Sequence, residues 1–166
     1  MSTLSVLQYP HKGLREVAPL ITVFDDGLRQ KVKEMFDTMY QDNGVGLAAT
    51  QVGLALRLYV MDASPHQNQP LCLINPEVIA AVGEVESEEG CLSFPGVYAK
   101  VIRAREVTVQ YQDEYGNSHT LTADGLMANC IQHELDHLNG VLFIDHLSKL
   151  KRERLLKKLE KIKRVA

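Results

Sequence analysis

The residues with the clearest chemical potential are two histidines and an acid in an H-E-x-x-H pattern, which spans His133 to His137. On a helix, side chains four residues apart lie on one face, so both imidazoles can bind a single metal ion. Glu134 stands beside them and is suited to move protons rather than to bind the ion. Because this short pattern also occurs by chance, its flanks and a third ligand must decide its meaning.

The flanking sequence predicts that the pattern lies on a buried helix. Asp124 is a candidate N-cap, and Asn139-Gly140 is a stop signal. Apolar residues occupy most sides of the segment 126–138, which favours burial. Buried histidines and acids need polar partners, and a metal ion would supply one.

The third metal ligand is most plausibly Cys91. A catalytic zinc-type site keeps three protein ligands and one position for water. Downstream, His146 and Glu153 have no recognisable third-ligand context, and His11, His66 and His119 have no motif context at all. Cys91 follows two acids and a glycine, which is not a core pattern, and a metal would hold it as a thiolate. A Cys-His-His set suits Zn, Fe or Co, and the spacing does not choose among them.

Composition indicates one cytoplasmic globular domain. Of the 166 residues, 45% are hydrophobic and 23% are charged. No apolar run approaches 18 residues, and the N-terminus lacks a basic stretch followed by an apolar core, so we expect neither a membrane segment nor a secretory signal. The three cysteines lack C-x-x-C spacing, and we expect Cys72 and Cys130 to be core thiols in a reducing compartment.

The charge is unevenly distributed. Residues 149–166 hold nine of the 18 Lys/Arg residues but only two of the 21 Asp/Glu residues, which leaves an acidic body. Leu155, Leu159 and Ile162 recur at helical spacing, so this segment is predicted to be a helix with one packing stripe and basic outer faces. Two interpretations of this helix remain open. It is either a solvated amphipathic helix or a segment that is attracted to a polyanion, chiefly ribosomal RNA. We expect no binding to DNA.

The remaining pattern predicts an α+β fold, with small antiparallel β-sheets around a buried central helix that carries H-E-x-x-H, plus a C-terminal helix. A first helix is expected from Asp25-Asp26 to near Asn43-Gly44. Strands are expected over 56–61, 71–75 (stopped by Pro76), 78–85, 106–112 and 118–122, the last two forming a hairpin.

The segment Gly44–Gly53 begins like the nucleotide fingerprint G-x-G-x-x-G/A. A helix precedes it rather than a strand, and no βαβ unit surrounds it, which argues against dinucleotide binding. Its glycines more plausibly let backbone approach a ligand or another segment closely. Gln51 is a polar side chain in an apolar run and should have a buried partner.

Three segments together resemble the signature motifs of peptide deformylases, in the family's order and over essentially the whole chain: Gly44–Gln51, Glu89–Ser93 and Gln132–His137. The long C-terminal helix resembles the type common in Gram-negative bacteria. The resemblance implies a single domain over 1–166 that hydrolyses the formyl group from the N-terminal formyl-methionine of new polypeptides and releases formate. We expect a monomer.

The resemblance also implies the roles of individual residues. Cys91, His133 and His137 would bind one divalent metal, Fe²⁺ in the family, with water as the fourth ligand; Zn²⁺, Ni²⁺ or Co²⁺ are possible replacements. Glu134 would be the general acid–base. Two further groups would stabilise the oxyanion, namely the Gln51 side-chain amide and the Leu92 backbone N–H.

The substrate pocket is assigned in the same way. The resemblance implies substrate contacts at Val45, Gly46, Gly90 and Leu126. Three residues depart from the family's common pattern: Ser87 and Asn129 where apolar residues are usual, and Tyr98 where an arginine is frequent. These departures bear on specificity rather than on the chemistry, and neutral drift is an equally good explanation.

Several alternatives remain. A general metallopeptidase would cleave internal peptide bonds and use a different third ligand. A deformylase-like protein without catalysis could act as a ribosome-associated module, but the intact set of Gln51, Cys91 and Glu134 argues against it. Asp136 either orients a ligand histidine or pairs at the surface. An Arg103–Glu89 ion pair behind Cys91 is also expected.

Overall fold

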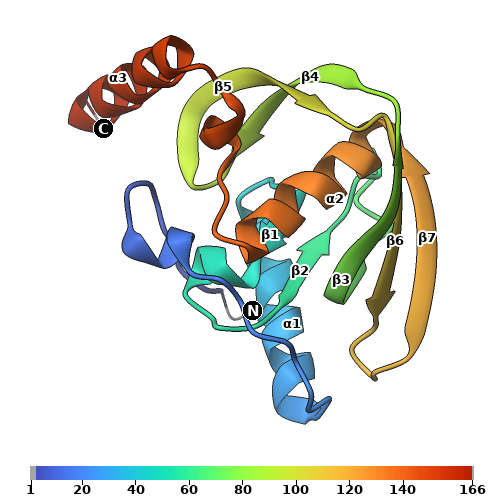
Figure 1. Ribbon diagram of the computed structural model, residues 1–166. Coiled ribbons are helices and arrows are strands. Elements are labelled where there is room, and N and C mark those ends of the chain that lie inside the picture. The colour runs from blue at the N-terminus through green and yellow to red at the C-terminus, as the bar shows by residue number, and fades with distance from the viewer. Residues whose placement is uncertain (1–2, 166) are drawn as a thin grey trace.

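The computed structural model describes residues 3–165 and has the expected α+β architecture (Figure 1). The helices are α1 (Asp26–Gln41), α2 (Gly125–Leu138) and α3 (Lys149–Val165), with short 3-10 turns η1 (Lys12–Arg15), η2 (Ala49–Val52) and η3 (Phe143–His146). One antiparallel sheet has the order β1 (Gly46–Ala48), β2 (Leu58–Met61), β3 (Leu71–Val82), β6 (Glu106–Gln112) and β7 (Ser118–Asp124). The other pairs β4 (Val85–Cys91) with β5 (Phe94–Arg103).

Helix α2 lies in the middle of the molecule, between the five-stranded sheet and the β4–β5 ribbon (Figure 1). Its residues Ala128, Ile131 and Leu138 are fully buried and pack in one core cluster with Tyr59 of β2 and Val109 of β6. The burial predicted from the sequence is therefore confirmed. Asp124 occupies the predicted N-cap position, although its side chain makes no capping hydrogen bond.

Helix α1 begins where the sequence predicts. The Asp25 side chain accepts a hydrogen bond from the Leu28 N–H and caps the helix. The residues Val32, Met35 and Met39 recur on one face, are buried, and belong to a second core cluster that includes β1 and β2. This cluster supports the segment from which Gln51 projects.

The predicted break at Pro76 is wrong. Strand β3 continues from Leu71 to Val82, and its pairing with β6 shifts register between Ile74 and Glu77 and again between Val78 and Ala80. Proline lacks an N–H for the ladder, and a bulge is where a strand can accommodate that loss. The third predicted strand, 78–85, is thus the end of β3, and Val85 already begins β4.

The β4–β5 hairpin has no counterpart among the predicted strands. Its inward-facing β4 row, Ser87, Glu89 and Cys91, is polar, so the apolar alternation typical of a half-buried strand is missing. Leu92 and Ser93 form the turn that links β4 to β5. Strand β5 buries Phe94, Val97 and Val101 in a third core cluster.

Helix α3 lies on the outer side of β5 (Figure 1). The predicted packing stripe is confirmed, since Leu155 and Leu159 are buried and Ile162 packs in the same cluster. A side chain at Gly96 of β5 would meet the Ile162 methyl at 3.2 Å, which shows how closely the two elements approach. Within residues 3–165, no helix is long and apolar enough to cross a membrane.

Candidate metal centre and active site

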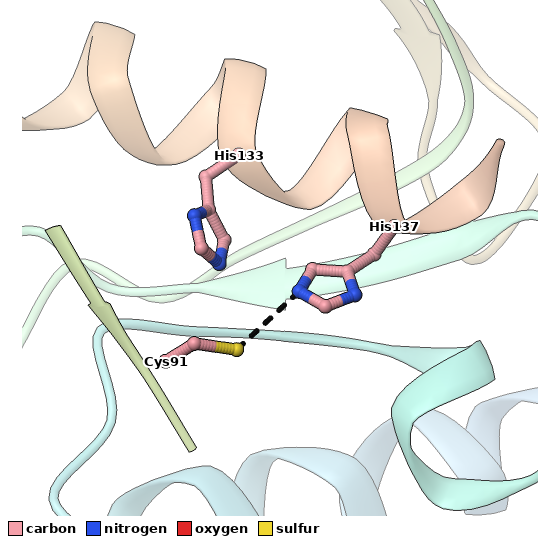
Figure 2. A group of neighbouring side chains, drawn as sticks. All are labelled: Cys91, His133 and His137. Atoms are coloured by element: carbon pink, nitrogen blue, oxygen red, sulfur yellow. Dashed lines mark hydrogen bonds between the residues drawn. The ribbon is translucent and has the colours of Figure 1, made fainter. Parts of the chain in front are cut away.

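The structure brings Cys91, His133 and His137 together at the junction of β4 and α2. Both histidines project from α2 toward the cysteine (Figure 2). One ligand atom from each of the three residues lies within 4.8 Å of the others. The Cys91 Sγ is 3.4 Å from the His137 Nε2. Among the described residues, this is the one group of His, Cys, Asp or Glu side chains with the geometry for a metal ion.

These three residues fit a tetrahedral metal ion. With ordinary ligand distances, a sulfur and a nitrogen on one tetrahedral ion lie roughly 3.5 Å apart, close to the observed Cys91–His137 separation. The His133 Nδ1 is occupied by a 2.9 Å hydrogen bond with Glu89, which leaves its Nε2 as the ligand atom. Burial lowers the pKa of His137 well below its usual value, which favours the neutral imidazole that a metal ligand requires. For His133, burial is outweighed by hydrogen bonds with Cys91 and Glu89, which raise its pKa, so a metal ion would have to displace that proton.

Glu89 and Arg103 form the support behind His133. The Arg103 guanidinium donates to both carboxylate oxygens of Glu89, at 2.8 and 2.9 Å, which confirms the predicted ion pair. Burial alone would raise the pKa of Glu89, but hydrogen bonds from Arg103 and His133 lower it to about 2. Glu89 therefore stays ionised, fixes the His133 ring and raises its basicity as a ligand.

Asp136 pairs with Arg103 rather than with a ligand histidine. Its Oδ2 accepts a 2.7 Å hydrogen bond from the Arg103 Nη1 and lies 2.8 Å from the His146 Nε2. Of the two predicted roles for Asp136, the structure thus shows charge pairing. Arg103 of β5 consequently bridges Glu89 of β4 and Asp136 of α2, so one buried guanidinium links the two elements that carry the candidate ligands.

Glu134 is buried and points into the same site. Its Oε2 is 4.0 Å from the His133 Nε2, and its Oε1 has no hydrogen-bond partner among the described residues. Burial raises the pKa of Glu134 to about 7, and a bound cation nearby would lower it again. A side chain at Gly46 would meet the Glu134 Oε2 at 2.7 Å, so the glycine is required for the carboxylate to lie here.

Gln51 has the buried partners that the sequence predicts. Its Oε1 accepts from the Ala48 N–H at 2.9 Å, which points the amide NH₂ toward the metal-ligand cluster. The Nε2 lies 3.1 Å from the Ser93 Oγ and 3.5 Å from the Cys91 Sγ. Leu92 occupies the first turn position between β4 and β5, where a backbone N–H takes no part in the strand ladder.

A cavity of about 500 Å³ opens beside these groups. The predicted residues that line it are Val45, Gly46, Gln51, Gly90, Cys91, Leu92, Tyr98, Leu126, Asn129, His133 and Glu134. His137 lies deeper and is 1% exposed. Ser87 does not line the cavity either, and instead accepts a 2.9 Å hydrogen bond from the Asn129 side chain.

Three large residues that line the cavity are exposed to solvent. Val45, Leu126 and Tyr98 are large apolar or aromatic residues, and they are 37%, 56% and 64% exposed. The Tyr98 ring lies against Gly90, where an added side chain would meet it at 2.6 Å. Exposed apolar side chains that line a cavity together with a few polar groups are typical of a ligand pocket.

Sequence reasoning did not identify the site contributions of Ser93 and Cys130. Ser93 is fully buried and contacts Gln51, and Cys130 lines the cavity next to Glu134. Cys130 was expected to be a core thiol, and it is indeed 7% exposed. The sequence does contain a signal for Cys130, namely its position on the helix. It shares one face with three other residues at helical spacing, Leu126, Asn129 and His133.

An α+β fold with an H-E-x-x-H helix, a third ligand from a neighbouring strand and an adjoining pocket defines a metal-dependent hydrolase. The sequence comparison specifies the family, because residues 3–153 match the family model described as polypeptide deformylase. The chain therefore belongs to the polypeptide deformylase family. Its members are hydrolases of protein biosynthesis that remove the N-formyl group from newly made polypeptides. The predicted family, fold and enzyme class are confirmed.

Individual relatives agree closely. A peptide deformylase from Pseudoalteromonas translucida is 55% identical over 161 residues, which are 97% of this chain and 96% of that protein. The crystal structure of a peptide deformylase from Legionella pneumophila matches with a TM-score of 0.95 and 46% identity, covering 99% of this chain and 97% of that one. A Synechococcus elongatus peptide deformylase solved in complex with actinonin matches with a TM-score of 0.90 and 45% identity, covering 93% and 86% of the two chains.

Proposed function

We propose that this chain hydrolyses the formyl amide of formyl-methionine at the start of nascent polypeptides and releases formate. The C–N bond of the formyl amide breaks, a C–O bond to water forms, and the proton of that water reaches the new amine. The observation that carries the proposal is convergence: a buried unpartnered carboxylate oxygen, an amide donor and a Cys-His-His cluster lie together beside one cavity.

Glu134 is the proton carrier in this proposal. Its Oε1 is buried without a partner, and a buried acceptor of this kind needs a donor. The attacking water supplies that donor. Glu134 takes the proton and passes it to the leaving amine, a general acid–base role that contributes about 10²–10⁴ to the rate.

Gln51 and Leu92 stabilise the oxyanion that forms at the formyl carbon. The Gln51 amide is held by Ala48 and Ser93, so its N–H groups are oriented before the reaction begins. The Leu92 N–H in the turn is the second donor. A glutamate at position 51 would have the same shape as Gln51 but would repel the developing charge.

Cys91, His133 and His137 would hold the metal ion, with Fe²⁺ as the expected occupant and Zn²⁺, Ni²⁺ or Co²⁺ as replacements. When bound, the ion would lower the pKa of a water molecule and polarise the formyl carbonyl. Glu89 orients His133 for that task through its hydrogen bond to Nδ1.

Formate release tests the proposed reaction. Protein prepared without oxygen and reconstituted with Fe²⁺ should release formate from a short formyl-methionyl peptide. In Glu134→Gln, which keeps the side-chain shape, kcat should fall by about 10²–10⁴. The metal content of both proteins should be equal. Release at the parental rate by the variant, or none by the metal-loaded parent, would contradict the assignment.

We further propose that residues 1–166 form a single monomeric domain that acts in the cytoplasm beside the ribosomal exit tunnel. The outer faces of α3 are lysine and arginine, whereas Leu155 and Leu159 attach it to the body. Deletion of 149–166 should weaken ribosome binding in a salt-sensitive way and leave turnover of short peptides intact. Equal ribosome affinity with and without the helix would exclude this role.

A further inference from the structure

Three side-chain contacts join β4 to α2 at regular intervals. Cys91 faces His137 at 3.4 Å, Glu89 faces His133 at 2.9 Å, and Ser87 faces Asn129 at 2.9 Å. The strand members are two residues apart and the helix members four apart, which correspond to rises of about 6.7 Å and about 6 Å. The Ser87–Asn129 pair is thus the next contact in the series after the two that hold metal ligands.

The Asn129 side of this third contact lines the cavity, on the helix face that leads away from Glu134. Asn129 precedes His133 by one helical turn and shares a face with Leu126 and Cys130, all of which line the cavity. In the proposed reaction, the formyl amide would lie between Glu134 and Gln51. The substrate's first side chain is attached one atom from the amide nitrogen and would therefore extend along this face.

The Ser87–Asn129 pair has unused hydrogen-bonding capacity. The Asn129 Nδ2 donates one of its two hydrogens to the Ser87 Oγ, and the Asn129 Oδ1 is buried without a partner. The Ser87 hydroxyl accepts this bond and retains its own proton. The terminal torsion of asparagine is soft, so the amide can turn toward a ligand.

We propose that the Ser87–Asn129 pair adapts the first-residue pocket to linear side chains that carry a hydrogen-bonding group at or near their end. This inference rests on the proposed deformylation and names its substrate class. A purely apolar side chain leaves the Asn129 Oδ1 buried and unpaired, whereas a terminal amide can both accept from the pair and donate to it. On a polypeptide that begins with methionine, the member of this class is methionine sulfoxide. The oxygen on its sulfur can accept a hydrogen bond from the Ser87 hydroxyl or the Asn129 amide, but it cannot donate one to the Asn129 Oδ1.

Matched formyl peptides test the proposal. The first residue is norleucine, methionine, methionine sulfoxide or glutamine, four linear side chains of similar length. The measured quantity is the kcat/KM for the glutamine or sulfoxide peptide divided by the kcat/KM for the norleucine peptide. This ratio should be about 3- to 10-fold higher in the parent than in Asn129→Leu, which is the contribution of one hydrogen bond. The change should appear mainly in KM. Asn68→Leu makes the same chemical change in the exposed loop 62–70 and should leave the ratio at the parental value.

The outcomes separate this inference from the proposed function. An unchanged ratio in Asn129→Leu, with the norleucine peptide still turned over, would overturn the role of the pair. Failure of the metal-loaded parent on all four peptides would overturn deformylation itself. If Asn129→Leu does not fold, Asn129→Ala removes the amide without adding bulk, and the ratio should fall in the same way.

Discussion

The two halves of α2 serve the same cavity but are held very differently. In its C-terminal half, His133 and Glu134 are buried, and the charged network of Glu89, Arg103 and Asp136 surrounds them. In its N-terminal half, Leu126 is 56% exposed and Asn129 makes one side-chain hydrogen bond to Ser87. The difference teaches that the candidate ligand His133 is held by a hydrogen-bonded charged network, whereas Asn129 and Leu126 on the pocket side have few contacts and can change without disturbing that network.

The largest effect is expected for Cys91→Ser, which changes the β4 residue that faces the histidines in the C-terminal half of α2. Serine keeps the size of the side chain but does not supply a thiolate, which is the soft ligand of the set. Even outer partners of metal ligands are worth 10- to 100-fold in affinity, so we expect a loss of more than about 100-fold. Metal retained against a competing chelator measures the effect, and circular dichroism checks folding. Parental affinity in the variant would point to a different third ligand and revive the general metallopeptidase.

The second test removes the support behind the histidines. Arg103→Met leaves the carboxylates of Glu89 and Asp136 without their cation in a site where Arg103 is only 4% exposed. The free energy of unfolding should fall by about 3–5 kcal/mol, as measured by urea denaturation. Arg15→Met is the matched control, because the Arg15–Asp145 pair is partly exposed and should be worth about 1 kcal/mol or less. Equal losses in the two variants would show that the buried network has no special importance.

The smallest effect is expected in the N-terminal half. Leu126→Ala removes apolar surface that is largely exposed, so the free energy of unfolding should change by less than about 0.5 kcal/mol. The KM for a formyl-methionyl peptide should rise by about 3- to 10-fold while kcat stays unchanged, because the lost contact is uniform binding. A large fall in kcat would mean that recognition and chemistry are coupled in this half as well.

Features that depend on residues close together in the sequence could be predicted from the sequence. The spacing of His133 and His137 is a property of one helix, so it predicts a candidate metal site and the element that carries it. The stripe of α3 and the cap of α1 at Asp25 are equally local. The alternation in β6 and β7 predicted their hairpin because both strands have the apolar period of a half-buried sheet.

The rest depended on contacts between distant segments. The bond between Glu89 and His133 joins residues 44 positions apart, and no local pattern determines which β4 residues face α2. The sequence does not predict strand β4, because its inward-facing residues are polar. They are polar because they line the candidate site, so the strand lacks the apolar alternation that identifies a half-buried strand. The sequence shows that Pro76 lacks an N–H, and this predicts a strand end. The bulge that accommodates the proline depends on pairing with β6, which the local sequence does not show.

The alternation of β4 also limits how the hairpin can evolve. Cys91, Leu92 and Ser93 are consecutive, and they belong respectively to the metal-ligand cluster, the turn and the support of Gln51. Insertion or deletion of one residue between Ser87 and Cys91 would turn part of the inward row to solvent and bring Glu88 or Gly90 inward. The segment from Ser87 to Cys91 can therefore tolerate changes of residue type on its outer face more readily than a change of length by one residue, and we expect homologous segments to differ here mainly by substitution.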